Sequence, residues 1–154
     1  MSAIRNIDGP KDFIFRVLSG VAIGIVAGLV PNAILGEIFK YLIQYQPIFK
    51  TLLGVVQAIQ FTVPALIGAL IAMKFNLTPL AIAVVASASY VGSGAAQFKN
   101  GVWIIAGIGD LINTMITAAI AVLFILLIEE RVGSMALIIF PTIVGDLSAT
   151  IGIF

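Results

Sequence analysis

Long apolar runs without charged residues dominate the sequence, and short polar or charged clusters separate them. Residues 17–36 contain no charged side chain, and residues 51–73 are uncharged between Lys50 and Lys74. An apolar run of about 20 residues is long enough to cross the hydrocarbon core of a bilayer as an α-helix. The pattern therefore predicts membrane-spanning helices.

Three further hydrophobic segments follow, at residues 75–98, 100–128 and 132–154. Pro64 lies inside the second segment and removes a backbone amide, which predicts a kinked helix. Small residues fill 92–97 and predict a pliant loop that can re-enter the membrane. We therefore expect one all-α polytopic integral membrane domain over 1–154, with about five hydrophobic segments and broken or kinked helices.

The first hydrophobic segment carries signals for its end and for its packing. Pro31 and Asn32 favour a helix end, so residues 33–45 are expected to form an amphipathic helix at the membrane surface. Three glycines recur at every fourth position, and such a stripe lets another helix approach closely. They are Gly20, Gly24 and Gly28.

Composition supports a membrane protein and excludes several kinds of chemistry. Hydrophobic residues make up 61% of the chain and charged residues 10%, with a mean hydropathy of +1.20. The chain has no cysteine and no histidine, which excludes disulfides, thiol nucleophiles, imidazole catalysis and the usual zinc sites. We therefore expect no catalytic residue, no metal ligand set, no cofactor and no nucleic-acid partner, and we do not expect an enzyme.

Two acids lie deep inside the apolar segments, and they share a local sequence. Asp110 and Asp146 each stand between glycine and leucine, and a threonine, Thr114 or Thr150, follows four residues later. An ionised carboxylate at the centre of a membrane helix costs roughly 2.5–3.5 kcal/mol, so such an acid is a functional-site hypothesis by default.

Polar residues near these acids extend the candidate site. Asn113 and Thr114 fall on the same helical face as Asp110 if the segment is helical throughout. A cavity lined by both acids could bind a polyhydroxylated solute or a proton. The alternative is that each acid only caps a broken helix or bonds a neighbouring hydroxyl. The candidate solute-binding residues are Asp110, Asn113, Thr114, Asp146, Gln57, Gln60, Ser93 and Gln97.

The distribution of basic residues predicts the orientation of the chain. With the N-terminus in the cytoplasm, five of the eight basic residues lie inside and three lie outside, which agrees with the positive-inside rule. The inside set is Arg5, Lys11, Arg16, Lys74 and Arg131, and the outside set is Lys40, Lys50 and Lys99. No clear signal-peptide cleavage site follows the first basic residues, so we expect the first segment to be retained.

The segment FIFRVLSGVAIGIVAGLVPNAILGE at residues 13–37 resembles the opening of bacterial phosphotransferase-system enzyme IIC-like permeases, in particular a perfringolysin-regulator-like branch. The loop at 92–97 and the two Gly-Asp-Leu segments are similar to that family as well. The resemblance implies a longer sugar permease in the bacterial plasma membrane, of which this chain matches the N-terminal half. It also implies soluble phosphotransferase components that carry the phosphoryl group. No residue of this chain takes over a family sugar-binding histidine or glutamate.

The expected function is therefore to bind and translocate a polar solute, most simply a carbohydrate, across the bilayer. One alternative is a permease-derived sensor or regulator without transport, and another is a small dimeric proton- or ion-coupled transporter. A purely structural subunit is the third. Because the sequence ends at Phe154 directly after an apolar segment, we expect either a homodimer or a C-terminal half as the partner.

Overall fold

A computed structural model describes residues 7–132 and 139–153 of the chain, so Arg5 and Phe154 lie outside the described residues. The fold is all-α apart from one small hairpin, which confirms the predicted class. The elements, in chain order, are α1 (Pro10–Leu42), α2 (Ile48–Gln60), α3 (Val63–Lys74), α4 (Pro79–Gly92), β1 (Ala96–Lys99), β2 (Val102–Ile105), α5 (Leu111–Val132), the π-helix η3 (Phe140–Gly145) and α7 (Asp146–Ile153).

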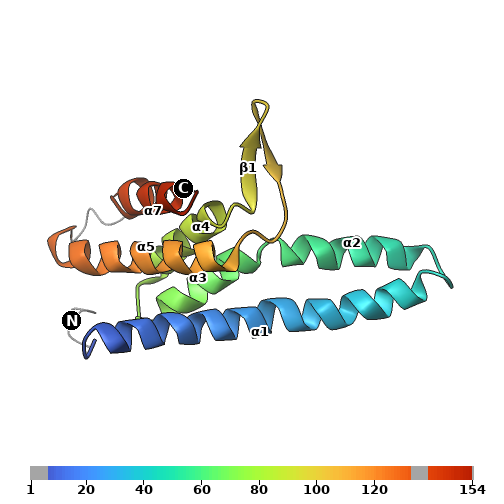
Figure 1. Cartoon of the computed structure of the whole chain (residues 1–154), viewed down its shortest axis with the longest axis horizontal. Coiled ribbons are helices and arrows are strands. Elements are labelled where there is room, and N and C mark those ends of the chain that lie inside the picture. Colours follow the sequence, from blue (N-terminus) through green and yellow to red (C-terminus); the bar gives the residue numbers. More distant parts are fainter. Residues whose placement is uncertain (1–6, 133–138, 154) are drawn as a thin grey trace.

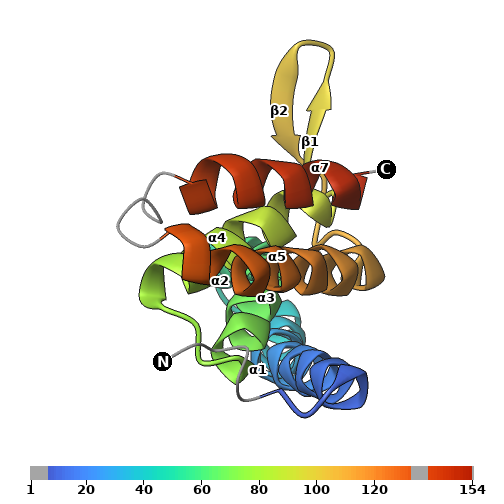
Figure 2. The ribbon, with the colours of Figure 1, turned by 90° about the vertical axis from the view of Figure 1, so that its left-hand side faces the viewer.

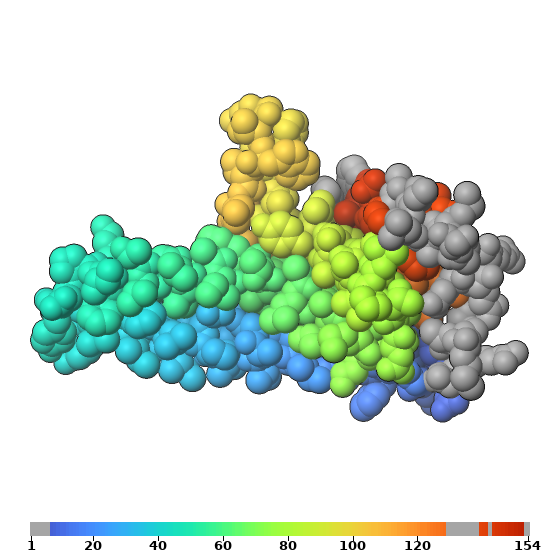
Figure 3. Space-filling view, turned by 180° about the vertical axis from the view of Figure 1, so that it is seen from behind, coloured from blue at the N-terminus to red at the C-terminus, as the bar shows by residue number. Residues whose placement is uncertain are grey.

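The helices form a bundle with an extended arm. The bundle contains the first half of α1 together with α3, α4, α5 and α7, whereas the second half of α1 and the antiparallel α2 extend beyond it (Figure 1). Seen along the bundle, α4 lies between α3 and α7, and α5 packs beside it (Figure 2). The hairpin projects sideways where the bundle ends and the arm begins (Figure 3).

The first helix is longer than the sequence predicts. α1 continues through Pro31 to Leu42, so the expected helix end at this proline and the separate helix at 33–45 are both wrong. Membrane helices tolerate proline when nearby side chains satisfy the disturbed backbone. Here the buried Asn32 donates its side-chain amide to the carbonyl of Gly28 at 2.6 Å, on the face that packs inward.

The glycine stripe of α1 packs within the chain. A Cβ placed on Gly20 would lie 2.6 Å from the Cα of Ile71, and one on Gly24 would lie 2.9 Å from the Cα of Ile67. Both partners belong to α3 and are completely buried. The stripe therefore holds α1 against α3, as close packing of membrane helices requires.

The predicted kink near Pro64 is present as a break between two helices. α2 ends at Gln60, α3 begins at Val63, and the two axes differ by 42°. Pro64 lies in the first turn of α3, where its missing N–H costs no helical hydrogen bond. The Thr62 hydroxyl donates to the carbonyl of Ile59 at 2.8 Å and satisfies part of the interrupted backbone.

By length and composition, two of the described helices can cross a bilayer, α1 and the portion of α5 from Leu111 to Ile128. The bent pair α2 and α3 makes a third if it counts as one span. α4 and the segment Ile143–Gly152 are apolar but shorter. The helical membrane character of the chain is thus clear, while the number of about five segments stays a prediction.

The segment after α4 forms a β-hairpin, whereas the sequence predicts a pliant loop at 92–97 that can re-enter the membrane. β1 and β2 pair antiparallel and are joined by Asn100 and Gly101, whose φ angles are +51° and +83°. Positive φ at both central residues is the signature of a tight type I′ turn, and Asn-Gly is its preferred sequence. Residues 100–128 are therefore not one continuous span, since α5 begins only at Leu111.

Candidate functional site

A cavity of about 480 Å³ lies at the base of the hairpin, where three helix ends meet it. The helix ends are the C-terminus of α4, the first turn of α5 and the end of α7. Its walls combine carboxamide, hydroxyl, ammonium and aromatic groups. The lining residues are Ser93, Gly94, Ala96, Gln97, Phe98, Lys99, Trp103, Asn113 and Gly152.

Three of the predicted site residues, Ser93, Gln97 and Asn113, line this cavity together. Ser93 is nearly fully buried, and its hydroxyl donates to the carbonyl of Tyr90 at 2.7 Å and accepts from the amide of Ala95 at 3.1 Å. The side-chain amide of Gln97 donates to the carbonyl of Gly94 at 3.1 Å. These local bonds fix the polar wall on the α4 side.

Asp110 lies next to this cavity but does not line it. Its side-chain Oδ1 accepts hydrogen bonds from the amides of Ile112 at 2.7 Å and Asn113 at 3.2 Å, which is the geometry of a helix N-cap. Its own amide donates to the carbonyl of Ser93 at 2.8 Å, which ties the start of α5 to the end of α4. The arrangement agrees with the capping alternative, and a ligand role for Asp110 stays a prediction.

The expectation that Asp110 sits in the middle of a helix is wrong, because residues 106–110 are not helical. Thr114 is completely buried one turn into α5, where its hydroxyl donates to the carbonyl of Asp110 at 2.7 Å. Thr114 therefore supports the helix start behind the cavity and does not line it.

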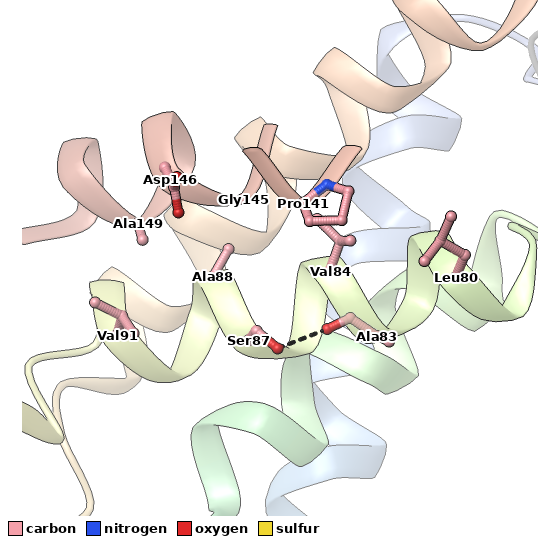
Figure 4. Close-up of a pocket in the computed structure, with 10 residues that line it drawn as sticks. All are labelled: Leu80, Ala83, Val84, Ser87, Ala88, Val91, Pro141, Gly145, Asp146 and Ala149. Carbon is pink, nitrogen blue, oxygen red and sulfur yellow. Dashed lines mark hydrogen bonds between the residues drawn. The ribbon is translucent and has the colours of Figure 1, made fainter. Parts of the chain in front are cut away.

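Asp146 lies elsewhere, in a groove of about 390 Å³ between α4 and the η3–α7 segment (Figure 4). The groove is largely apolar, and Ser87 supplies a second polar side chain, whose hydroxyl donates to the carbonyl of Ala83 at 2.9 Å. Pro141 and Gly145 of the π-helix form part of the wall. The two acids do not share one cavity, so the expectation of a single cavity lined by both is wrong.

The two glutamines of α2 are separate from both hollows. Gln57 is exposed and Gln60 is half-buried, and neither lines the hairpin cavity or the groove beside Asp146. Their assignment as solute ligands stays a prediction without support from this geometry.

Sequence reasoning missed three residues that line the hairpin cavity, namely Phe98, Lys99 and Trp103. The rings of Phe98 and Trp103 face each other across the two strands, with 5.4 Å between their centroids. The missed signal was Asn100-Gly101, the strongest short-range mark of a hairpin, between residues with β-forming side chains. A hairpin there would have placed these residues side by side.

The chemistry available in the hairpin cavity suits recognition of a solute by hydrogen bonds. Carboxamides can donate and accept, and hydroxyls can do both. The cavity contains a cation, Lys99, and none of its lining residues is acidic. Among residues 7–132 and 139–153, no group of three or more His, Cys, Asp or Glu residues is placed to hold a metal ion.

The chain thus combines helices that are long and apolar enough to cross a bilayer with a partly polar cavity where α4, α5, α7 and the hairpin meet. A family model described as "Phosphotransferase system, EIIC" matches residues 15–154. The chain therefore belongs to the phosphotransferase-system EIIC family, as its sequence resemblance predicted, and is a permease-type component of such a system. The match does not separate the branches of the family.

Comparisons with curated proteins and with solved structures found no match to this chain.

Proposed function

We propose that this chain belongs to a phosphotransferase-system permease that binds a carbohydrate in the cavity at the base of the hairpin. The observation that carries the proposal is the convergence of Ser93, Gln97 and Asn113 on one cavity. These residues come from the end of α4, from β1 and from α5, and the fold alone brings them together.

The composition of the cavity favours a hydroxylated solute. Carboxamide side chains can donate one hydrogen bond and accept another, which matches the amphoteric hydroxyls of a sugar. Trp103 adds an aromatic surface, and apolar rings together with a few placed polar groups are typical of small-molecule sites. A volume of about 480 Å³ is sufficient for one or two sugar rings.

The remaining features of the proposal follow from the family and from the charge pattern. The phosphoryl group would come from soluble phosphotransferase components, since the chain offers no histidine or cysteine to carry it. The N-terminus would face the cytoplasm of a bacterial cell, because more of the basic residues then lie inside. A second copy or a C-terminal half would complete the permease.

The cavity can be tested by binding of neutral sugars to the full-length protein in lipid nanodiscs. Glucose, mannose and N-acetylglucosamine serve as probes, each measured by isothermal titration calorimetry. Asn113→Ala should weaken the affinity by about tenfold, because it removes one hydrogen-bonding group at a cost of roughly 1.4 kcal/mol.

Gln44→Ala is the matched control, since Gln44 is an exposed carboxamide at the turn between α1 and α2. It should bind like the unmodified protein. Equal affinity of the Asn113→Ala variant, or no binding of any probe by the unmodified protein, would contradict the proposal. Uptake measured in bacterial cells that supply the soluble phosphotransferase components separates the functions, since binding without uptake there would indicate a sensor.

A further inference from the structure

One strand supplies an unusually continuous part of the cavity wall. All four residues of β1, Ala96 to Lys99, line the cavity, whereas β2 contributes only Trp103. Side chains alternate between the two faces of a strand. Consecutive residues can therefore line one cavity only if the cavity meets β1 along its edge, where the backbone is accessible.

The strand register identifies the backbone groups on this edge. The two-residue turn makes Lys99 and Val102 a hydrogen-bonded pair, and pairing then alternates down the hairpin. The amide of Ala106 donates to the carbonyl of Ala95 at 2.8 Å, which fits the same alternation. Ala96 and Phe98 therefore belong to pairs that are not hydrogen-bonded, and their N–H and C=O groups point away from β2.

The position of the hairpin along the bundle determines what can hydrogen-bond these outward backbone groups. α5 runs antiparallel to α1, and Met115 and Ile116 share a small cavity with Val17 and Leu18 (Figure 1). The start of α5, and with it the hairpin base, then lies at the same level along the bundle as the uncharged stretch of α1 at 17–36 (Figure 1). At membrane depth, strand edges are tolerated only where protein covers them or where they line a water-filled cavity.

We propose that the outer edge of β1 is a part of the solute site, and that the backbone groups of Ala96 and Phe98 hydrogen-bond the solute. This inference rests on the proposed carbohydrate site and assigns it a backbone component. Two residues along a strand span about 6.8 Å, a distance that two hydroxyls on the same side of a hexose can bridge. The preferred solute is therefore a sugar that offers donors and acceptors along one side.

Hydrogen–deuterium exchange tests the edge without any mutation. The full-length protein in nanodiscs is labelled with and without the best-binding neutral sugar, and exchange is resolved to single residues. The amides of Ala96 and Phe98 should exchange at least about fivefold more slowly with the sugar, because each would then be hydrogen-bonded. Ile105, whose amide faces outward on the opposite edge and which does not line the cavity, is the internal control and should not change.

A matched pair of proline variants tests the same edge by affinity. Ala96 and Ile105 form one cross-strand pair, and neither N–H belongs to the ladder, so proline at either position keeps the hairpin bonds. Ala96→Pro should weaken sugar binding by about tenfold, because it deletes one donor to the solute. Ile105→Pro deletes the equivalent donor on the opposite edge and should bind normally.

The outcomes separate this inference from the proposed function. If the unmodified protein binds none of the neutral sugars, the carbohydrate site itself is wrong and the inference falls with it. If it binds a sugar but Ala96 and Phe98 show no protection, the backbone role alone is wrong. Equal weakening by the two proline variants would also overturn it, because the effect would then come from the hairpin and not from one edge.

Discussion

The two Gly-Asp-Leu segments have the same residues and different structures. At residues 109–111 the chain enters a helix from a loop, and Asp110 caps that helix with its carboxylate. At 145–147 the chain is already helical, and Asp146 lies in αR conformation between a π-helix and α7, beside an open groove. Only the threonine bond is the same, since Thr114 and Thr150 each donate to the carbonyl of the preceding aspartate at 2.7 Å.

The difference comes from what precedes each segment. Gly107 and Gly109 have φ angles of +150° and +71°, which only glycine adopts easily, so the backbone reverses before α5 starts. Pro141 lies four residues before Gly145, and the helix passes through it with the wider π geometry. A short repeated sequence thus determines one local hydrogen bond, while its surroundings determine whether the acid is bonded to the backbone or available to a groove.

The largest difference in stability is expected between alanine substitutions of the two glycines, Gly109 and Gly145. Gly109→Ala should destabilise the fold by about 2–4 kcal/mol, because alanine is strained at this positive φ and its Cβ would meet Ser93. The new Cβ would lie 2.5 Å from the Ser93 hydroxyl oxygen and 2.8 Å from its carbonyl oxygen. Gly145→Ala is the control, since its Cβ would make an ordinary contact of 3.5 Å with Val84. Thermal unfolding in detergent measures both, and equal losses would remove the distinction.

A smaller difference in stability is expected between substitutions of the two acids, Asp110 and Asp146. Asp110→Ala should cost about 1 kcal/mol of stability because α5 loses its N-cap, whereas Asp110→Asn should cost only a few tenths because the amide oxygen still accepts. Asp146→Ala should leave stability almost unchanged, since its carboxylate bonds no backbone amide among the described residues. Unfolding midpoints of the three variants check this order. A larger loss for Asp146→Ala would show that its groove is structural.

The smallest contrast concerns the shared threonine bond. Thr114→Val should destabilise by about 0.5–1.5 kcal/mol, because it removes a hydrogen bond from a completely buried hydroxyl. Thr150→Val should be close to neutral, since Thr150 is exposed and its bond contributes less. Chemical unfolding in mixed micelles resolves differences of this size. Identical values would mean that burial does not distinguish the two sites.

The apolar pattern predicted the helical membrane fold well, because the length of an uncharged run directly limits what it can cross. The apolar pattern failed at Pro31. There the packing of α1 against the rest of the bundle and the hydrogen bond of the Asn32 side chain outweigh the preference of proline to end a helix. It also failed at the hairpin, where a run of small and apolar residues hid a turn signal. Helix and strand are hard to tell apart in short apolar runs.

The candidate site could be predicted only in parts. Ser93, Gln97 and Asn113 were each recognisable as polar residues in apolar surroundings, and they do line one cavity. The separation of Asp110 from Asp146 could not be predicted, because it depends on how α5 and α7 pack on α4. The cap at Asp110 was one of two open alternatives, and the glycine at 109 was the residue that favoured it.

The length of α1 has a consequence for the surrounding lipid. Its 33 residues extend about 50 Å at 1.5 Å per residue, whereas a typical hydrocarbon core is about 30 Å thick. Tilting the whole helix into that core would need an inclination of more than about 50°, beyond the range of up to about 40° found for membrane helices. One end of α1 therefore leaves the core, and the pair Tyr41 and Tyr45 beside its last turn suits the headgroup region. In bilayers made from longer acyl chains, more of the arm formed by α1 and α2 is accordingly expected to lie in the hydrocarbon core. The hydrophobic thickness of the bilayer can therefore shift the position of this chain in its membrane.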